Sequence, residues 1–146
     1  MQRNDSLDNK IIYCRGYQSL SDSVNIATKT WKAIGMDTLD TNVNNMFSIS
    51  NRRIVIPVNG LLIATARCSF VNNTTGDRGI SFEVNGSMVN STSVVNRACE
   101  TTQTHLCTQI ITHVSAGDTI TMHAYQTSGS SLGLESAWIR CALIKD

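Results

Sequence analysis

The fold class can be read from one run of residues, Leu61-Leu-Ile-Ala-Thr-Ala-Arg-Cys-Ser-Phe-Val71. Apolar residues occupy every second position of this run, which is typical of a β-strand with one buried face. The residues on that face are Leu62, Ala64, Ala66, Cys68 and Phe70. Leu61 and Ile63 place apolar side chains on the opposite face as well, so the strand requires cover on both sides.

The segment 136–144 has the same two-sided character. One face carries Ala137, Ile139, Cys141 and Leu143, and the opposite face carries Trp138, Ala142 and Ile144. A second sheet of the same chain covers one face, and a large exposed apolar patch is unusual for a monomer. Self-association is the simplest cover for the other face. The predicted interface residues are Leu61, Ile63, Trp138, Ala142 and Ile144.

Short apolar runs separated by turn signals continue along the chain, and no window sustains the spacing of an amphipathic helix. The pattern predicts ten strands, over 11–18, 30–36, 45–49, 52–57, 61–71, 78–85, 88–96, 104–114, 118–126 and 136–144. Residues that tolerate a positive φ separate many of them, at Asn59-Gly60, Thr75-Gly76, Asn85-Gly86, Ala116-Gly117 and Ser128-Gly129. Along 78–85, apolar and polar residues alternate, which predicts one buried face and one solvent-facing side. The fold class is therefore all-β, a two-sheet sandwich or barrel.

Length and composition narrow the function classes. The chain has 146 residues, which fits one domain over 11–146 after a polar arm over 1–10. With a net charge of +1 and no cluster of Lys or Arg, we expect no nucleic-acid partner. The absence of a long apolar run predicts no membrane insertion, and the polar start predicts synthesis in the cytosol. Five widely spaced cysteines are accordingly expected to be reduced, without a zinc site.

Several motifs occur in a recognisable order along 11–146. They are Trp31, the segment Arg53-Ile-Val-Ile-Pro57-Val-Asn-Gly60, the turn Asn85-Gly86, the stretch Val114-Ser-Ala-Gly-Asp118 and the stretch Ala124-Tyr-Gln-Thr-Ser-Gly129. This order resembles the globular head shared by complement component one q and tumour necrosis factor, in the versions found in bacteriophage and bacterial proteins. The resemblance implies a ten-stranded jelly roll whose inner sheet packs around a threefold axis, hence a homotrimer. The collagen repeat that precedes animal heads does not occur in this sequence.

No pattern in the sequence indicates catalysis or a cofactor. The sequence shows no positioned nucleophile with a partner base, so we predict a protein that is not an enzyme. His105 and His113 share one side of the strand 104–114, where a ring of symmetry-related histidines could hold a metal or anion if that side faced the axis. The simpler interpretation is a strand whose polar face is partly exposed to solvent and holds no metal. Asp118 is interpreted as a turn residue, and Trp31 as a packing residue or a platform for glycan stacking.

The remaining functions are binding and assembly. We predict a bacteriophage virion surface protein, made in the cytoplasm of the bacterial host, that serves as a head fibre, a capsid decoration protein or a tail-tip module. Its arm, with Arg3, Asp5 and Leu7, is expected to dock on a neighbouring virion protein. The alternative is an adhesin or lectin-like head for host attachment, which would bind a cell-surface saccharide.

Overall fold

A computed structural model describes residues 10–19 and 24–146 of the chain. Within these ranges the protein forms twelve β-strands and one short 3₁₀ turn, Val43–Asn45. Most of the predicted arm, including Arg3, Asp5 and Leu7, lies outside the described residues. The first described residue, Lys10, is already tied to the domain, because its carbonyl accepts a hydrogen bond from the Lys145 backbone at 2.8 Å.

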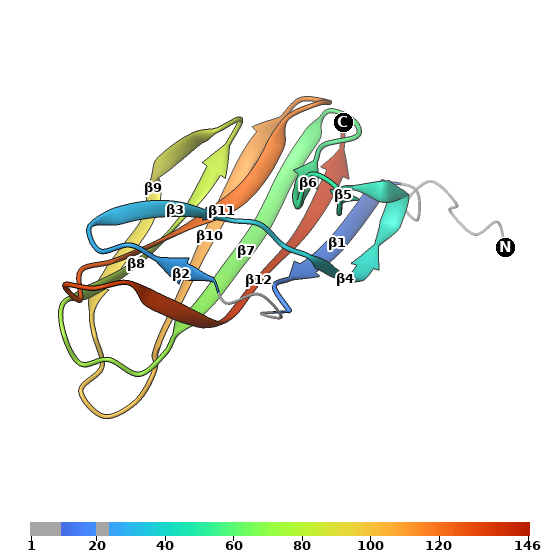
Figure 1. The fold of residues 1–146 in the computed structure, drawn as a ribbon. Helices are drawn as coiled ribbons and strands as arrows, with labels where there is room; N and C mark the ends of the chain where they lie inside the picture. The colour runs from blue at the N-terminus through green and yellow to red at the C-terminus, as the bar shows by residue number, and fades with distance from the viewer. Residues whose placement is uncertain (1–9, 20–23) are drawn as a thin grey trace, which may run out of the picture.

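The strands make two antiparallel sheets that pack face to face (Figure 1). The first sheet has the order β10 (Thr104–Val114), β7 (Gly60–Phe70), β12 (Leu132–Lys145), β1 (Ile11–Tyr17) and β4 (Thr38–Asn42), and β2 (Asn25–Ile26) also pairs with β12. The second has the order β5 (Phe47–Ser48), β6 (Arg53–Val55), β11 (Thr119–Gln126), β8 (Asp77–Val84) and β9 (Ser87–Arg97), and β3 (Thr30–Ile34) also pairs with β11. The predicted all-β, two-sheet jelly roll is confirmed.

The hydrophobic core lies between the sheets and follows from the two-residue period of the strands. The alternate residues of β7 from Leu62 to Phe70 are buried, as are those of β12 from Ala137 to Leu143. The opposite faces of the same strands point away from the core, as the sequence predicts. The first and last strands, β1 and β12, run side by side in the first sheet (Figure 1), so the two ends of the domain are held together.

The number of strands differs from the expected ten. Each predicted segment overlaps a strand, but the described residues contain two further ones, β2 and β4, and β12 begins at Leu132 rather than at 136. β4 reads Thr-Leu-Asp-Thr-Asn, which is too polar to produce an alternating signal. It is a strand because it pairs with β1 at the edge of the sheet, and this pairing between distant segments leaves no local trace.

The structure confirms the predicted turn at Asn85-Gly86 and corrects the one at Asn59-Gly60. Asn85 and Gly86 have φ values of 52° and 80° and join β8 to β9, as expected of an Asn-Gly hairpin turn. Gly60, however, has no positive φ and begins β7 instead of forming a turn. A Cβ atom at Gly60 would lie 2.3 Å from the carbonyl oxygen of Ile144, so glycine is needed there for a close approach between β7 and β12.

The prediction of a solvent-facing side on 78–85 is wrong. Ser81 and Glu83 point away from the core, yet both are buried. The Ser81 hydroxyl lies 3.2 Å from the Val89 carbonyl oxygen and 3.2 Å from the Thr92 hydroxyl, both on β9. β8 lies between β11 and β9, and side chains of both neighbours cover its polar face.

Candidate self-association surface

The outward face of the first sheet carries a continuous group of apolar side chains. Strand register places Ile111, Ile63, Ala142 and Tyr13 in one row across β10, β7, β12 and β1. The adjacent row consists of His113, Leu61, Ile144 and Ile11. We call the seven apolar residues of these two rows the apolar patch: Ile11, Tyr13, Leu61, Ile63, Ile111, Ala142 and Ile144.

The apolar patch contains most of the exposed large hydrophobic residues in the described part of the chain. Five of its members are the exposed large hydrophobic residues of this face: Ile11 (49%), Tyr13 (52%), Ile63 (41%), Ile111 (67%) and Ile144 (37%). Among the described residues, only Ile49 and Val95 are comparable elsewhere. A contiguous patch of this kind typically marks a protein–protein contact.

Four of the five predicted interface residues, Leu61, Ile63, Ala142 and Ile144, belong to the apolar patch. Trp138 lies two rows away, opposite Tyr17 and Arg67 on the neighbouring strands. The Arg140 guanidinium lies over its ring at 4.6 Å from the ring centroid, so the indole is partly covered within its own chain. Ile11, Tyr13 and Ile111 were not among the predicted interface residues.

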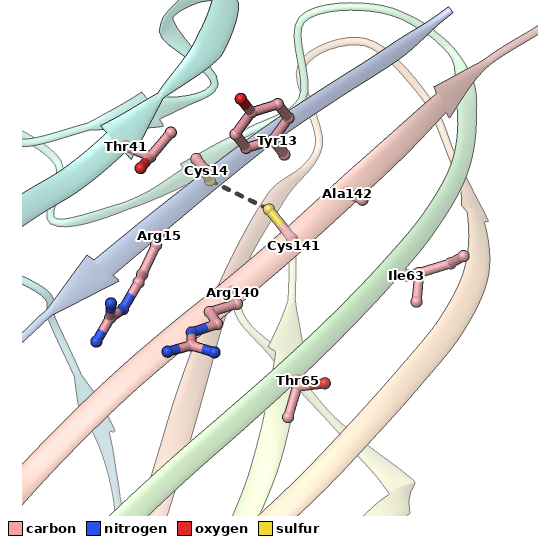
Figure 2. A pocket seen from close by; sticks show the side chains of 9 residues that line it. All are labelled: Tyr13, Cys14, Arg15, Thr41, Ile63, Thr65, Arg140, Cys141 and Ala142. Carbon is pink, nitrogen blue, oxygen red and sulfur yellow. Dashed lines mark hydrogen bonds between the residues drawn. The ribbon is translucent and has the colours of Figure 1, made fainter.

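A polar row borders the apolar patch, and residues of both line one hollow. The row consists of Gln109, Thr65, Arg140 and Arg15, and the Arg15 guanidinium pairs with Asp40 at 2.5 Å. The hollow has a volume of about 330 Å³. Figure 2 shows Tyr13, Ile63 and Ala142 around this hollow together with the two arginines. The face is therefore apolar at one end and cationic next to it.

The two candidate histidines lie on the outward face of β10, at the edge of the first sheet. His113 is opposite Leu61 at the border of the apolar patch, whereas His105 is opposite Ser69 near the other end of the strand. Eight residues of extended chain separate them by about 26 Å, so they cannot share one site. The described part of the chain contains no group of three or more His, Cys, Asp or Glu residues suited to a metal ion.

A buried polar pair on the second sheet was not expected from the sequence. The Nε2 atom of His123 on β11 lies within hydrogen-bond distance of the Glu83 carboxylate on β8, and their side chains are 15% and 8% exposed. On the sequence alone, His123 is interpreted as an ordinary surface or packing residue. Its Nδ1 atom is buried and has no hydrogen-bond partner among the described residues.

Aromatic side chains gather on the same outward face of the second sheet. The Trp31 and Tyr125 rings stack with centroids 5.0 Å apart and an interplanar angle of 25°. Gly79 lies beside them, and a Cβ atom there would be 2.8 Å from the Trp31 ring. Val95, opposite Gly79 on β9, is half exposed. The rings are half-buried, so this surface is both packed and partly accessible.

Asp118 acts as a turn residue, as predicted. Its carboxylate accepts hydrogen bonds from the Ser115 backbone and from the Asn85 side chain, each at 2.9 Å. The hydrogen bond from Ser115, followed by that from Asn85, holds the pKa of this carboxyl below its usual value. The aspartate thereby connects the turn before β11 to the hairpin tip between β8 and β9.

Within the described ranges, no helix has the length and apolar character needed to cross a membrane. No protein-family model matches the sequence, and no curated protein matches it.

Solved structures with the same fold are available. The globular domain of zebrafish complement 1qA protein has a TM-score of 0.60 at 9% identity, over 91% of this chain and 96% of that one. Eiger TNF from S. frugiperda has a TM-score of 0.64 at 9% identity, over 94% of each chain. Murine APRIL at pH 8.0 has a TM-score of 0.69 at 10% identity, over 92% of this chain and 99% of that one. The protein therefore has the two-sheet jelly-roll fold of the complement 1q and tumour necrosis factor globular heads.

Proposed function

We propose that the protein is a non-enzymatic homotrimer in which the outward face of the first sheet packs around a threefold axis. The apolar patch is the observation that carries this proposal. Removing apolar surface from water is favourable by about 25 cal/mol for each Å², which offsets part of the entropic cost of association. A monomer would leave Tyr13, Ile63 and Ile111 in water together, and trimer formation would bury them.

A threefold arrangement fits the position of β10. Contacts around such an axis are heterologous, which means that two different surfaces of the chain meet in each interface. β10 lies at the edge of the first sheet and presents Ile111, while Tyr13 and Ile63 lie further inside the sheet. The edge of one subunit would then pack against the interior of the apolar patch of the next subunit.

The proposed biological role is that of a bacteriophage virion surface protein, as a head fibre, a capsid decoration protein or a tail-tip module. Its motifs resemble the bacteriophage and bacterial versions of the head, and the polar segment 1–10 would dock on a neighbouring virion protein. The bacterial host cytoplasm is the proposed place of synthesis and the virion surface the final location. No cofactor is part of this role.

Two measurements test the proposal. Analytical ultracentrifugation of the full chain at micromolar concentration should report three chains for each particle, and a monodisperse monomer would refute the trimer. A variant that lacks residues 1–9 should unfold at the same temperature as the full chain, because Lys10 keeps its contact with Lys145. If these residues are the docking element, the variant should be missing from purified virions, and normal incorporation would overturn that assignment.

The stacked pair of Trp31 and Tyr125 favours a second candidate, a host-recognition adhesin that binds a cell-surface saccharide. Half-buried aromatic rings beside the exposed Val95 offer an apolar surface against which a sugar ring can stack. The two candidates differ in a simple experiment. Trp31→Ala should abolish binding of fluorescent protein to host cells if the head is an adhesin, whereas a purely structural head should show no such binding before or after the substitution.

A further inference from the structure

Two cysteine side chains meet on the core-facing side of the first sheet. Cys14 on β1 lies directly opposite Cys141 on β12, and the two Sγ atoms are 3.1 Å apart (Figure 2). Both residues are buried, with exposed fractions of 2% and 5%. The separation exceeds a disulfide bond of about 2.05 Å by roughly one ångström, so small side-chain rotations suffice to close it.

The other cysteines lack such an arrangement. Cys68 on β7 is buried in the core, while Cys107 on β10 is exposed and lies opposite Arg67 on the outward face. These two thiols therefore point to opposite sides of the sheet. Cys99 follows β9, and its sulfur lies near the hydroxyl of Thr101. Among the described residues, Cys14 and Cys141 are the pair that the fold places for covalent linkage.

We propose that Cys14 and Cys141 are an oxidisable dithiol that closes into a disulfide when the protein meets a peroxide. One thiol loses its proton, and its sulfur attacks a peroxide oxygen to give a sulfenic acid and water. The second sulfur then attacks the sulfenic sulfur, and a second molecule of water leaves. Two thiols and one hydrogen peroxide thus become one disulfide and two waters.

The surroundings of the pair favour a small oxidant and a slow reaction. Both sulfurs face the core, where the Cys141 Sγ atom lies 3.8 Å from the Met46 Sδ atom, whereas the 330 Å³ hollow lies on the outward face of the same strands. Only a small oxidant that enters the domain can therefore reach them. The hydrogen bond with Cys14 and burial together raise the pKa of the Cys141 thiol far above its usual range. Cys141 is therefore protonated at neutral pH, and the pair should persist as a dithiol in a reducing compartment.

Closure would link the two ends of the domain. The two cysteines are 127 positions apart in the sequence, so the disulfide would strongly restrict the unfolded chain. It would also connect β1 to β12 next to Tyr13 and Ala142, which face each other in the apolar patch. The inference does not depend on trimer formation, because both sulfurs belong to one chain.

The test uses the full chain, treated with hydrogen peroxide in its native state, then unfolded and alkylated without a reductant. We expect loss of two hydrogen atoms in the intact mass, a linked peptide pair that contains Cys14 and Cys141, and alkylation of the remaining three of the five cysteines. Thermal unfolding should shift to a higher temperature, and a reductant should reverse the shift.

Matched variants complete the design. Cys14→Ser should remain without a disulfide after peroxide, whereas Cys107→Ser should close as the wild type does. Full alkylation of Cys14 and Cys141 after native peroxide treatment would overturn the proposal, as would a linkage through Cys107 or direct conversion of either thiol to a sulfinic acid. If Cys14→Ser does not fold, the wild-type peptide map is sufficient, because it shows directly whether Cys14 and Cys141 are linked.

Discussion

Ile63 on β7 lies directly opposite Ile111 on β10, and both side chains face away from the core of their own domain. On the other side of Ile63 lies Ala142, followed by Tyr13. The row runs across four neighbouring strands without a charged residue. A charge introduced at its centre would have no partner, so the proposed interface is most sensitive at Ile63.

Ile63→Glu should break the trimer. Burying an unpaired charge costs several kcal/mol for each site, and the symmetry of the trimer repeats the cost in each subunit. Sedimentation should report monomers at a concentration where the wild type is trimeric. Circular dichroism should remain that of a β protein, because Ile63 does not pack in the core.

Val95→Glu is the matched control for this prediction. Val95 is 50% exposed, comparable to Ile63, but it lies on β9 in the second sheet. We expect Val95→Glu to sediment as a trimer, like the wild type. If Val95→Glu dissociates the trimer and Ile63→Glu does not, the interface lies on the second sheet.

The sequence predicts the two-sided strands because the period of a strand is visible in a short window. It therefore identifies Ile63 and Ile144 without knowledge of the pairing. Tyr13 escapes such reasoning, because its membership of the apolar patch depends on the pairing of β1 with β12 near the other end of the chain. The same limitation explains the wrong solvent-facing side of 78–85: the side chains that bury Ser81 come from β9 and are chosen by register.

The pair formed by Glu83 and His123 should show strong coupling in a double-mutant cycle. Glu83→Gln or His123→Gln alone leaves a buried partner without its charge-assisted hydrogen bond, which should destabilise the fold by about 1–3 kcal/mol. The double variant should cost less than the sum of the two single variants. Urea unfolding at a fixed protein concentration measures all four proteins.

The exposed pair of Arg15 and Asp40 provides the comparison. Its side chains are 37% and 47% exposed, and ion pairs of this type contribute about 0–1 kcal/mol. A coupling energy for Glu83 and His123 no larger than that of the exposed pair would contradict the structural role assigned to the buried one.

Gly79→Ala should disturb the aromatic stack. A Cβ atom at this position would lie 2.8 Å from the Trp31 ring and 3.2 Å from the Cβ of Tyr125. Overpacking of this kind costs about 1–3 kcal/mol. We expect a lower unfolding temperature together with a changed near-ultraviolet dichroism of the aromatic residues.

Gly133→Ala serves as the control, since the nearest atom to its added Cβ is the flexible Asn25 side chain at 3.3 Å. Equal losses in the two variants would show that the Trp31 contact is not what requires glycine at position 79.

Asp118→Ala should destabilise the protein in a manner that depends on pH. The substitution removes the acceptor for the Ser115 backbone and the Asn85 side chain, and with it the link between two turns. The pKa of Asp118 in the folded state lies below its ordinary value of 3.8. The ionised carboxylate therefore contributes stability above about pH 3.8, and this contribution is lost as the pH falls through the folded pKa.

The wild type and Asp118→Ala should accordingly differ in unfolding temperature by the same amount from about pH 5 to 7. The difference should become smaller in more acidic solution. Asp118→Asn separates charge from hydrogen bonding, because its amide oxygen still accepts a hydrogen bond but does not titrate. We expect Asp118→Asn to lie between the other two proteins at neutral pH and to approach the wild type in acid. A difference between wild type and Asp118→Ala that stays constant down to pH values well below 3.8 would mean that the carboxylate charge does not stabilise this turn.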